Sequence, residues 1–443
     1  MPQSLSTLPQ PQGPNVVAEY YQDNLNFLSR CARDYEEIVP IQMDDGLHCL
    51  LTNPDHIAAV LKDRKLFTKA SDLQLLKDLL GNGLVVSEGS FWSRQRRLIQ
   101  PVFHRERIHS YGATMVEYAQ KMLQSWQSDE QHNVSEDMAR LTLNIVMKTL
   151  FDQDLTGKDA ANVALVLDAT TDWIAEQALA TAENTSVPEA ANTRYKDAIA
   201  LFVKTLDGMI KQRHQAGLTG NDLLTLLMQV EDADDGSRMS NQQLRDESVT
   251  LIIAGHETTA NTLTWAWYLL GQHPKVQSKL QEELRTVLAG RVPTVEDLPN
   301  LIYANQIIQE AMRLYPAAIE VTREASEDCE IGGYCIPRGT TLIASQWVMH
   351  RDPQYFENPE LFQPERWADE LEKRLPRGVY FPFGDGPRVC IGKSFAQMEA
   401  VLILATIAQQ FTLELVPNQE IVLEPSLTLR PKDGLQVILR HVC

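Results

Sequence analysis

The sequence predicts a mainly α-helical chain with small β-sheets contributed by both ends. Apolar residues recur at spacings of three and four from about residue 91 to 230, which is the period of amphipathic helices. A long helical segment follows at 240–270. Alternating segments typical of strands occur near the N-terminus and again after residue 328.

The N-terminal part begins with a proline-rich segment, and we expect an irregular lead-in and a first helix within residues 1–36. Two strands are predicted at 37–43 and 48–53. The sequence between them, Asp44-Asp45-Gly46, is typical of a hairpin turn. A helix over 55–64 follows.

The longest predicted helix spans residues 240–270, about 45 Å at 1.5 Å per residue. Ser240 and Gln243 match a capping box at its start. Gly271 and Pro274 are expected to end it. Its central sequence, LIIAGHETTANTLTW, is apolar on nearly all sides, so we expect this helix to be buried.

Composition and charge exclude some classes of function. The 443 residues carry a formal net charge of −19, which repels nucleic acid. No apolar run is long enough to span a bilayer, and the N-terminus lacks the features of a signal peptide. We therefore expect a cytoplasmic protein with no transmembrane anchor. The acidic run Glu231–Gly236 is expected to be a solvated loop, and the six cysteines to be free thiols, including Cys329 and Cys335 beside a Gly-Gly turn.

The most informative segment is FPFGDGPRVCIGKSFAQMEA, residues 381–400. Cys390 lies just before a predicted helix at 393–411, where free N–H groups and the helix dipole lower the pKa of a thiol. No histidine base is near in sequence, so a thiolate metal ligand is favoured over a nucleophile. The glycines of the loop permit a bound group to approach its backbone closely. They therefore argue against the alternative that Cys390 is a buried structural cysteine. The loop residues that support this interpretation are Phe383, Gly386, Arg388 and Gly392.

These residues match the pattern F-x-x-G-x-R-x-C-x-G, and the chain resembles the cytochrome P-450 family from about residue 37 to its end. The resemblance implies that family's fold, with the long central helix over a haem b, and Cys390 as the axial thiolate that favours O–O cleavage. It implies contacts to the haem propionates from Trp92, Arg96, Arg323 and Arg388. It also implies a buried structural network of Glu310, Arg313 and Arg366.

The sequence AGHETT at 254–259 matches the family's oxygen-activation segment. The resemblance implies that Ala254 and Gly255 leave room for O2. It implies that Glu257 and Thr258 form an acid–alcohol pair that steers protons. The alternative for Thr258 is a hydroxyl that only bonds back to a helix carbonyl. His256 is expected to be packed or solvent-linked, not a ligand.

The resemblance also implies electrons from NAD(P)H through a separate reductase, since the chain ends 53 residues after Cys390. We expect a single haem domain over 1–443, monomeric, with a ferredoxin- or flavodoxin-type redox partner. A basic patch would suit such a partner, although the same residues could be ordinary surface charges: Arg94, Arg97, Lys373, Arg374, Arg377 and Lys393.

The family resemblance implies a monooxygenase that inserts one oxygen atom of O2 into an apolar substrate. The segment before Trp92, LLKDLLGNGLVVSEGSF, resembles the bacterial fatty-acid hydroxylase branch, so a long-chain fatty acid is the first expectation. Only His48 could hold a carboxylate near the first strand turn, so a terpenoid or retinoid-like substrate is the alternative. A haem-thiolate isomerase or peroxygenase would alter Glu257 and Thr258, and a non-enzymatic haem protein would not need Thr258. The mapped pocket is apolar, as a long apolar substrate requires: Leu80, Val85, Ile253, Ala254, Ala318, Ile319 and Leu427.

Overall fold

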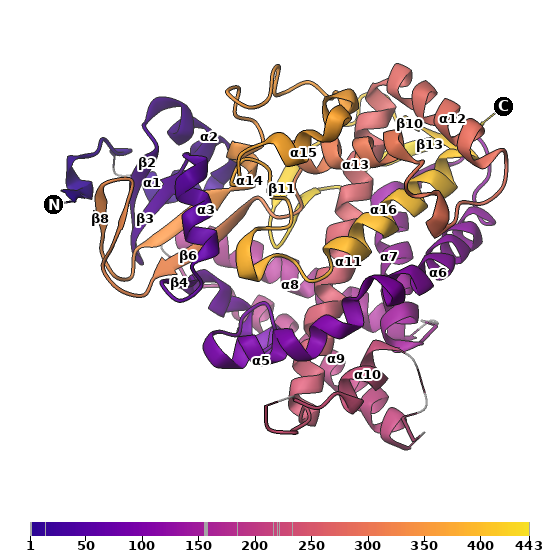
Figure 1. The fold of residues 1–443 in the computed structure, drawn as a ribbon, viewed down its shortest axis with the longest axis horizontal. Coiled ribbons are helices and arrows are strands. Elements are labelled where there is room, and N and C mark those ends of the chain that lie inside the picture. Colours follow the sequence, from indigo (N-terminus) through magenta and orange to yellow (C-terminus); the bar gives the residue numbers. More distant parts are fainter. Residues whose placement is uncertain are drawn as a thin grey trace.

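The computed structural model describes residues 2–442 apart from 14, 155–157, 184, 216, 219, 221 and 233. Helices dominate the described residues. Their strands form one five-stranded sheet, two three-stranded sheets and one two-stranded sheet (Figure 1). The predicted fold class, mainly α with small sheets, is confirmed.

The N-terminal segment is more ordered than the sequence suggested. Strand β1 (Gln3–Ser4) pairs in parallel with β8 (Tyr334–Ile336), and Gln3 N donates to Gly333 O over 2.8 Å. A 3-10 turn follows and buries Leu5 and Leu8. The expected irregular lead-in is found only over residues 9–13, which include Pro9 and Pro11, because strand pairing and two apolar side chains anchor residues 3–8. The helices α1 (Val16–Gln22) and α2 (Asn24–Asp34) come next.

The largest sheet has the order β2-β3-β9-β6-β4. Its first two strands are the predicted hairpin, and α3 (Pro54–Lys62) follows them. The pairing of β4 with β6 places Lys69 opposite Arg323. The strands are β2 (Ile38–Met43), β3 (Gly46–Leu51), β4 (Phe67–Lys69), β6 (Glu320–Ala325) and β9 (Thr341–Ser345).

Helix α11 (Asn241–Gln272) crosses the helical body (Figure 1). Both bonds of the predicted capping box are present: Gln243 N donates to Ser240 Oγ over 3.2 Å, and Ser240 N donates to Gln243 Oε1 over 2.8 Å. The helix continues through Gly271 and stops only before Pro274, the first residue of α12 (Pro274–Leu288).

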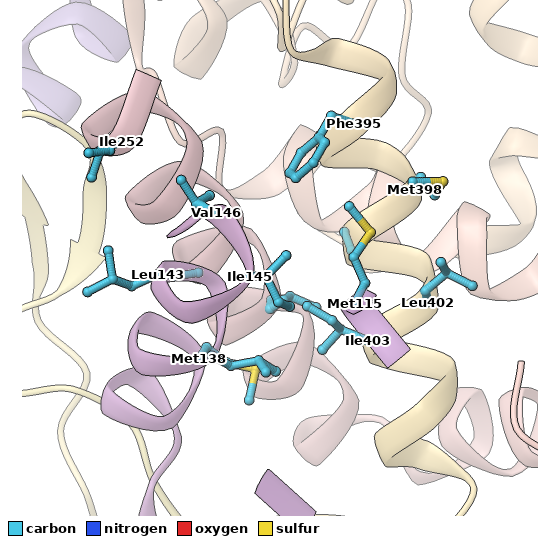
Figure 2. Close-up of a cluster of buried hydrophobic side chains, with 14 of the residues drawn as sticks. Met115, Met138, Leu143, Ile145, Val146, Ile252, Phe395, Met398, Leu402 and Ile403 are labelled. Carbon is cyan, nitrogen blue, oxygen red and sulfur yellow. The ribbon is translucent and has the colours of Figure 1, made fainter. Parts of the chain in front are cut away.

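Figure 2 shows part of the core around this helix, where buried side chains of several helices pack together. Met115 comes from α6 (Arg105–Leu123), Val146 from α7 (Val134–Phe151), Ile252 from α11, and Phe395 from α16 (Lys393–Ala408). The other helices of the body are α4 (Lys77–Leu80), α5 (Gly89–Ile99), α8 (Lys158–Ala182), α9 (Glu189–Gln215), α10 (Leu223–Gln229), α13 (Ile302–Leu314), α14 (Gln346–Met349) and α15 (Leu371–Arg374).

The remaining strands lie in the smaller sheets. The helix expected over 393–411 ends at Ala408, because Phe411 already pairs with His441 in a strand. Hairpin β7–β8 turns at Gly332-Gly333 as predicted. The strands are β5 (Gln131–Asn133), β7 (Cys329–Ile331), β10 (Phe411–Leu415), β11 (Leu423–Pro425), β12 (Leu429–Pro431) and β13 (Gln436–His441).

The acidic run at 231–236 is not simply a solvated loop. Asp232 is only 3% exposed, and its carboxylate binds Arg94 Nε at 2.8 Å and Arg97 Nη2 at 3.0 Å. The five cysteines in the described residues are free thiols, and Cys443 lies outside them. A search of the described helices finds none that is both long and apolar enough to cross a bilayer.

Candidate functional site

A cavity of about 370 Å³ lies against α11 and the loop that precedes α16. Most of the candidate residues predicted from the sequence meet on its wall, although they are spread over 308 positions, from Val85 to Gly392. They are Val85, Trp92, Arg96, Ala254, Gly255, Thr258, Ala318, Arg323, Phe383, Arg388, Cys390 and Gly392.

The loop before α16 holds Cys390 by backbone contacts. Cys390 N donates to Phe383 O over 2.9 Å. Gly386 has φ +70°, and a Cβ there would lie 2.2 Å from Leu61 O, so glycine is required. Gly392 differs from the expectation. Its φ is −87°, and a Cβ there would meet only Cys390 Sγ, at an ordinary 3.8 Å.

The sulfur of Cys390 faces the cavity and is exposed to it. Desolvation by the surrounding protein raises the pKa of this thiol. The backbone N–H of Gly392, the charge of Arg96 and the N–H of Lys393 oppose that shift. The expected net lowering of the thiol pKa is therefore wrong for the protein alone, because desolvation outweighs the helix terminus. A bound metal ion would supply the positive charge that a thiolate needs here.

Aromatic and cationic side chains lie along one side of the cavity. The guanidinium groups of Arg64 and Arg388 lie over the Trp92 ring, at 5.1 Å and 5.5 Å from its centre. Arg96 Nη1 donates to Val389 O over 2.7 Å, so it also braces the cysteine loop. Arg388 forms an ion pair with Glu88 and donates to Phe67 O over 3.0 Å.

Lys69 is a cavity residue that the sequence analysis missed. Its Nζ donates to Leu84 O over 2.7 Å and to Ser87 O over 2.8 Å. Burial lowers the pKa of Lys69 to about 7. A single lysine at the end of a three-residue strand has no distinctive sequence signal, and only the pairing of β4 with β6 brings it beside Arg323.

The two members of the expected acid–alcohol pair face different surroundings. Thr258 lines the cavity, and its hydroxyl donates to Ala254 O over 2.8 Å. Glu257 does not line the cavity. Its carboxylate accepts a hydrogen bond of 2.6 Å from Thr428 Oγ1, and burial raises its pKa. His256 is buried beside them, and desolvation lowers its pKa to about 4.

Three of the seven predicted pocket residues, Val85, Ala254 and Ala318, lie on the cavity wall. The other four are not on this wall and stay predictions. Leu80 and Ile253 are buried in the main core, Leu427 packs against that core, and Ile319 packs against a cluster that includes Trp265. His48 is also absent from the wall, and its Nε2 lies 2.9 Å from Asp45 Oδ1.

The Glu310–Arg313–Arg366 network is assembled in the structure. Glu310 and Arg313 are fully buried and joined by two hydrogen bonds of 2.9 Å. Arg366 Nε donates to the same carboxylate over 2.8 Å.

The expected basic patch is largely neutralised by nearby acids. Asp232 binds two of the predicted cations, Glu370 binds another, and Glu372 binds Lys393 at 3.1 Å. Of the six, Arg94, Arg97, Lys373 and Lys393 have a carboxylate partner, which weakens the electrostatic argument for an acidic redox protein.

The cavity fits a thiolate-bound haem on its own chemistry. A thiol faces it, and the charged residues on its described wall are four cations and no acid: Lys69, Arg96, Arg323 and Arg388. The Gln346 amide and Arg388 Nε are buried at this wall and have no hydrogen-bond partner among the described residues. A flat apolar cofactor with two carboxylates would satisfy this arrangement.

Comparisons with known proteins agree with this class of site. Residues 13–439 match the cytochrome P-450 family model. Cyclooctatin synthase of Streptomyces melanosporofaciens is 36% identical over 89% of this chain and 86% of its own length. Pentalenene oxygenase of Streptomyces avermitilis is 30% identical over 90% and 88%. The crystal structure of the cytochrome P450DA heme domain has a TM-score of 0.88 at 28% identity, and the match covers 98% of both chains.

The fold and the cysteine-centred cavity define a haem-thiolate protein. The chain belongs to the cytochrome P-450 family. It is accordingly an oxidoreductase of the monooxygenase class, and its family uses haem and O2.

Proposed function

We propose that this monooxygenase oxidises a neutral, apolar substrate of the terpenoid kind, and that the Cys390 thiolate would hold a haem b. The charge balance of the cavity carries this proposal. Three of its four cations would face three negative charges, namely two haem propionates and Glu88, which already pairs with Arg388, because the haem iron balances the Cys390 thiolate. The fourth cation, Lys69, already donates to two loop carbonyls, and burial lowers its pKa to about 7, so no fully charged cation on the described wall is left over for a substrate carboxylate.

The rest of the wall supports an apolar substrate. Its residues near the loop before α5 and near α7 are aliphatic: Leu73, Leu84, Val85, Val146 and Leu150. Relatives named for cyclooctatin and pentalenene act on terpenoids, which agrees with such a wall. The fatty-acid expectation lacks both supports, since His48 is occupied by Asp45 and lies away from the cavity.

In this mechanism the residues of the protein hold the cofactor, orient the substrate and transfer a proton into the cavity. Trp92, Arg96, Arg323 and Arg388 would hold the propionates. A haem bound there supplies the activation of O2 and the transfer of one oxygen atom to the substrate.

Thr258 would hold a proton at Oγ1 on the cavity wall. To donate that proton into the cavity, its hydroxyl must turn away from Ala254 O. Glu257, on the neighbouring face of α11, would have to leave Thr428 to resupply the proton. Electrons would come from NAD(P)H through a separate redox partner, and a cytoplasmic, monomeric protein is part of this proposal.

A spin-state titration tests the substrate class. The purified ferric, haem-loaded protein would be titrated with pentalenene, palmitic acid and methyl palmitate while the Soret band is followed. We expect a low-to-high-spin shift with pentalenene, and no advantage of the acid over its ester. A shift that requires the free acid, and that disappears in Lys69→Met, would refute the charge balance and make Lys69 a carboxylate anchor.

A further inference from the structure

The connection between α4 and α5, residues 81–88, places Leu84 and Val85 on the cavity wall. Its backbone lies directly on α11. A Cβ at Gly83 would lie 2.1 Å from Thr250 Oγ1, and a Cβ at Gly81, where φ is +56°, would lie 2.3 Å from Asp246 Cγ. Larger residues at either glycine would lift this loop from the helix.

Two consecutive carboxylates of α11 bind the loop backbone. The N–H of Asn82 donates to Asp246 Oδ2, and the N–H of Leu84 donates to Glu247 Oε2, both over 2.9 Å. The second oxygen of Glu247 accepts from Gln95 Nε2 on α5 over 3.1 Å. Glu247 and Gln95 are both fully buried, so one carboxylate joins α11, the loop and α5.

Lys69 binds the same loop residue from β4. Leu84 therefore donates its N–H to Glu247 and gives its carbonyl to Lys69, at 2.9 Å and 2.7 Å. Glu247 is fully buried, and burial raises its pKa to about 7, whereas Lys69 is only partly buried and lies on the cavity wall. An apolar side chain would pack here without that desolvation, but it could not accept the Leu84 N–H.

We propose that Glu247 is a positioning residue that fixes Leu84 and Val85 on the cavity wall and thereby determines which ligand shapes fit above Cys390. This inference rests on the haem-thiolate function proposed above. Glu247 touches neither the cavity nor the reacting atoms, so it acts through Leu84.

The chain offers a matched control in Glu283 on α12. Its carboxylate likewise binds backbone N–H groups of another segment, Tyr303 N at 2.5 Å and Ala304 N at 2.9 Å, at the start of α13. Burial raises its pKa as well, but it does not line the cavity. Glu283→Ala therefore removes a similar structural role at a distance from the loop.

The experiment uses iron-ligating azoles, because their Soret shift does not depend on the native substrate. Dissociation constants of imidazole and 4-phenylimidazole would be measured for the haem-loaded protein, and their ratio reports the space above the iron. Hydrogen exchange of the peptide covering 81–88 would be followed by mass spectrometry. The variants are Glu247→Ala, Glu247→Asp, Glu247→Gln and Glu283→Ala.

In Glu247→Ala and Glu247→Asp we expect the azole ratio to change by about fivefold or more and the loop to exchange faster. Glu247→Asp keeps the charge, but its shorter side chain cannot reach the Leu84 N–H. This variant therefore tests the proposal if Glu247→Ala does not fold. Glu247→Gln keeps an oxygen for Leu84 N–H and should stay within about twofold, as should Glu283→Ala.

An unchanged ratio in Glu247→Asp, or an equal change in Glu283→Ala, would overturn the proposal. A missing Soret band in the unaltered protein would instead contradict the haem-thiolate function proposed above, and not the role of Glu247. Hydrogen exchange would then test the loop alone, and equal exchange in Glu247→Asp and the unaltered protein would overturn the role of Glu247.

Discussion

Replacing Glu310 by glutamine should destabilise the protein strongly, because this carboxylate neutralises two buried arginines. Glu310 and Arg313 are 0% exposed, and the Arg366 side chain is 9% exposed. The carboxylate accepts five hydrogen bonds of 2.8–3.0 Å, from Arg313 Nε and Nη2, Gln363 N, Arg366 Nε and Trp367 Nε1. No water can replace these contacts at a fully buried site without opening the structure.

The expected magnitude follows from the cost of an uncompensated buried charge. Removing one partner of a buried ion pair typically costs about 3–5 kcal/mol. Glu310→Gln keeps one oxygen as an acceptor, so we expect about 3 kcal/mol, and Glu310→Ala about 5 kcal/mol. A stable protein has only about 5–15 kcal/mol in total. With a slope of about 3 kcal/mol per M, the urea midpoint of Glu310→Gln should fall by about 1 M.

Urea unfolding at pH 7, followed by tryptophan fluorescence, measures this difference. Glu282 and Arg285 provide the control, since they form an ion pair at the same i,i+3 spacing on α12 but are 63% and 76% exposed. Glu282→Gln should cost less than about 1 kcal/mol. If Glu310→Gln lost no more stability than Glu282→Gln, the reasoning from burial would be refuted.

Three further predictions concern the cavity and α11. Because the pKa of His256 is about 4 when folded and 6.5 ordinarily, the unfolded chain binds its proton more readily, and stability should fall by about 2 kcal/mol as pH drops from 7 to 5. His256→Gln should lose that part of the slope in unfolding measured at both pH values; an identical slope would contradict it. Cys390→Ser should abolish the red-shifted Soret band of the ferrous carbon-monoxide complex, and a retained band would mean another ligand. Thr258→Ala should lower product per electron by about tenfold or more, with the electrons recovered as hydrogen peroxide; unchanged product per electron, measured against NADPH consumed, would remove its role in proton transfer.

The elements that the sequence predicted well are those with strong local patterns. The hairpin at 38–51 has alternation and a turn sequence, and α11 has a capping box and a long apolar run. The cysteine loop was recognisable because its glycines and Arg388 have fixed spacing around Cys390. These signals lie within a few residues of one another, so a single sequence is enough to read them.

Helix periodicity separates the predicted pocket residues of α11 that line the cavity from one that does not. Residues advance by 100° around a helix, so positions three or four apart share a face. Ala254 and Thr258 share the cavity face of α11, as do Leu251 and Thr262. Ile253 precedes Ala254 by one residue, a turn of 100° away from that face, and does not line the cavity.

Other features depend on contacts between distant segments and have no local signal. Lys69 reaches the cavity because β4 pairs with β6, more than 250 positions away. Asp232 was predicted to lie in a solvated loop with its acidic neighbours, but it is buried and forms ion pairs with two arginines of α5. Phe411 continues an apolar helical pattern but joins a strand opposite His441. In each case tertiary pairing overrides the local preference.

The pairing of β1 with β8 has a practical consequence for anyone who shortens or tags this protein. Removal of residues 2–12 would uncover the outer edge of β8 and the apolar sites that Leu5 and Leu8 occupy. An unpaired strand edge beside exposed apolar surface is a template for association with another chain. Truncated preparations should therefore self-associate more readily, while an affinity tag joined through a polar spacer would leave the edge covered.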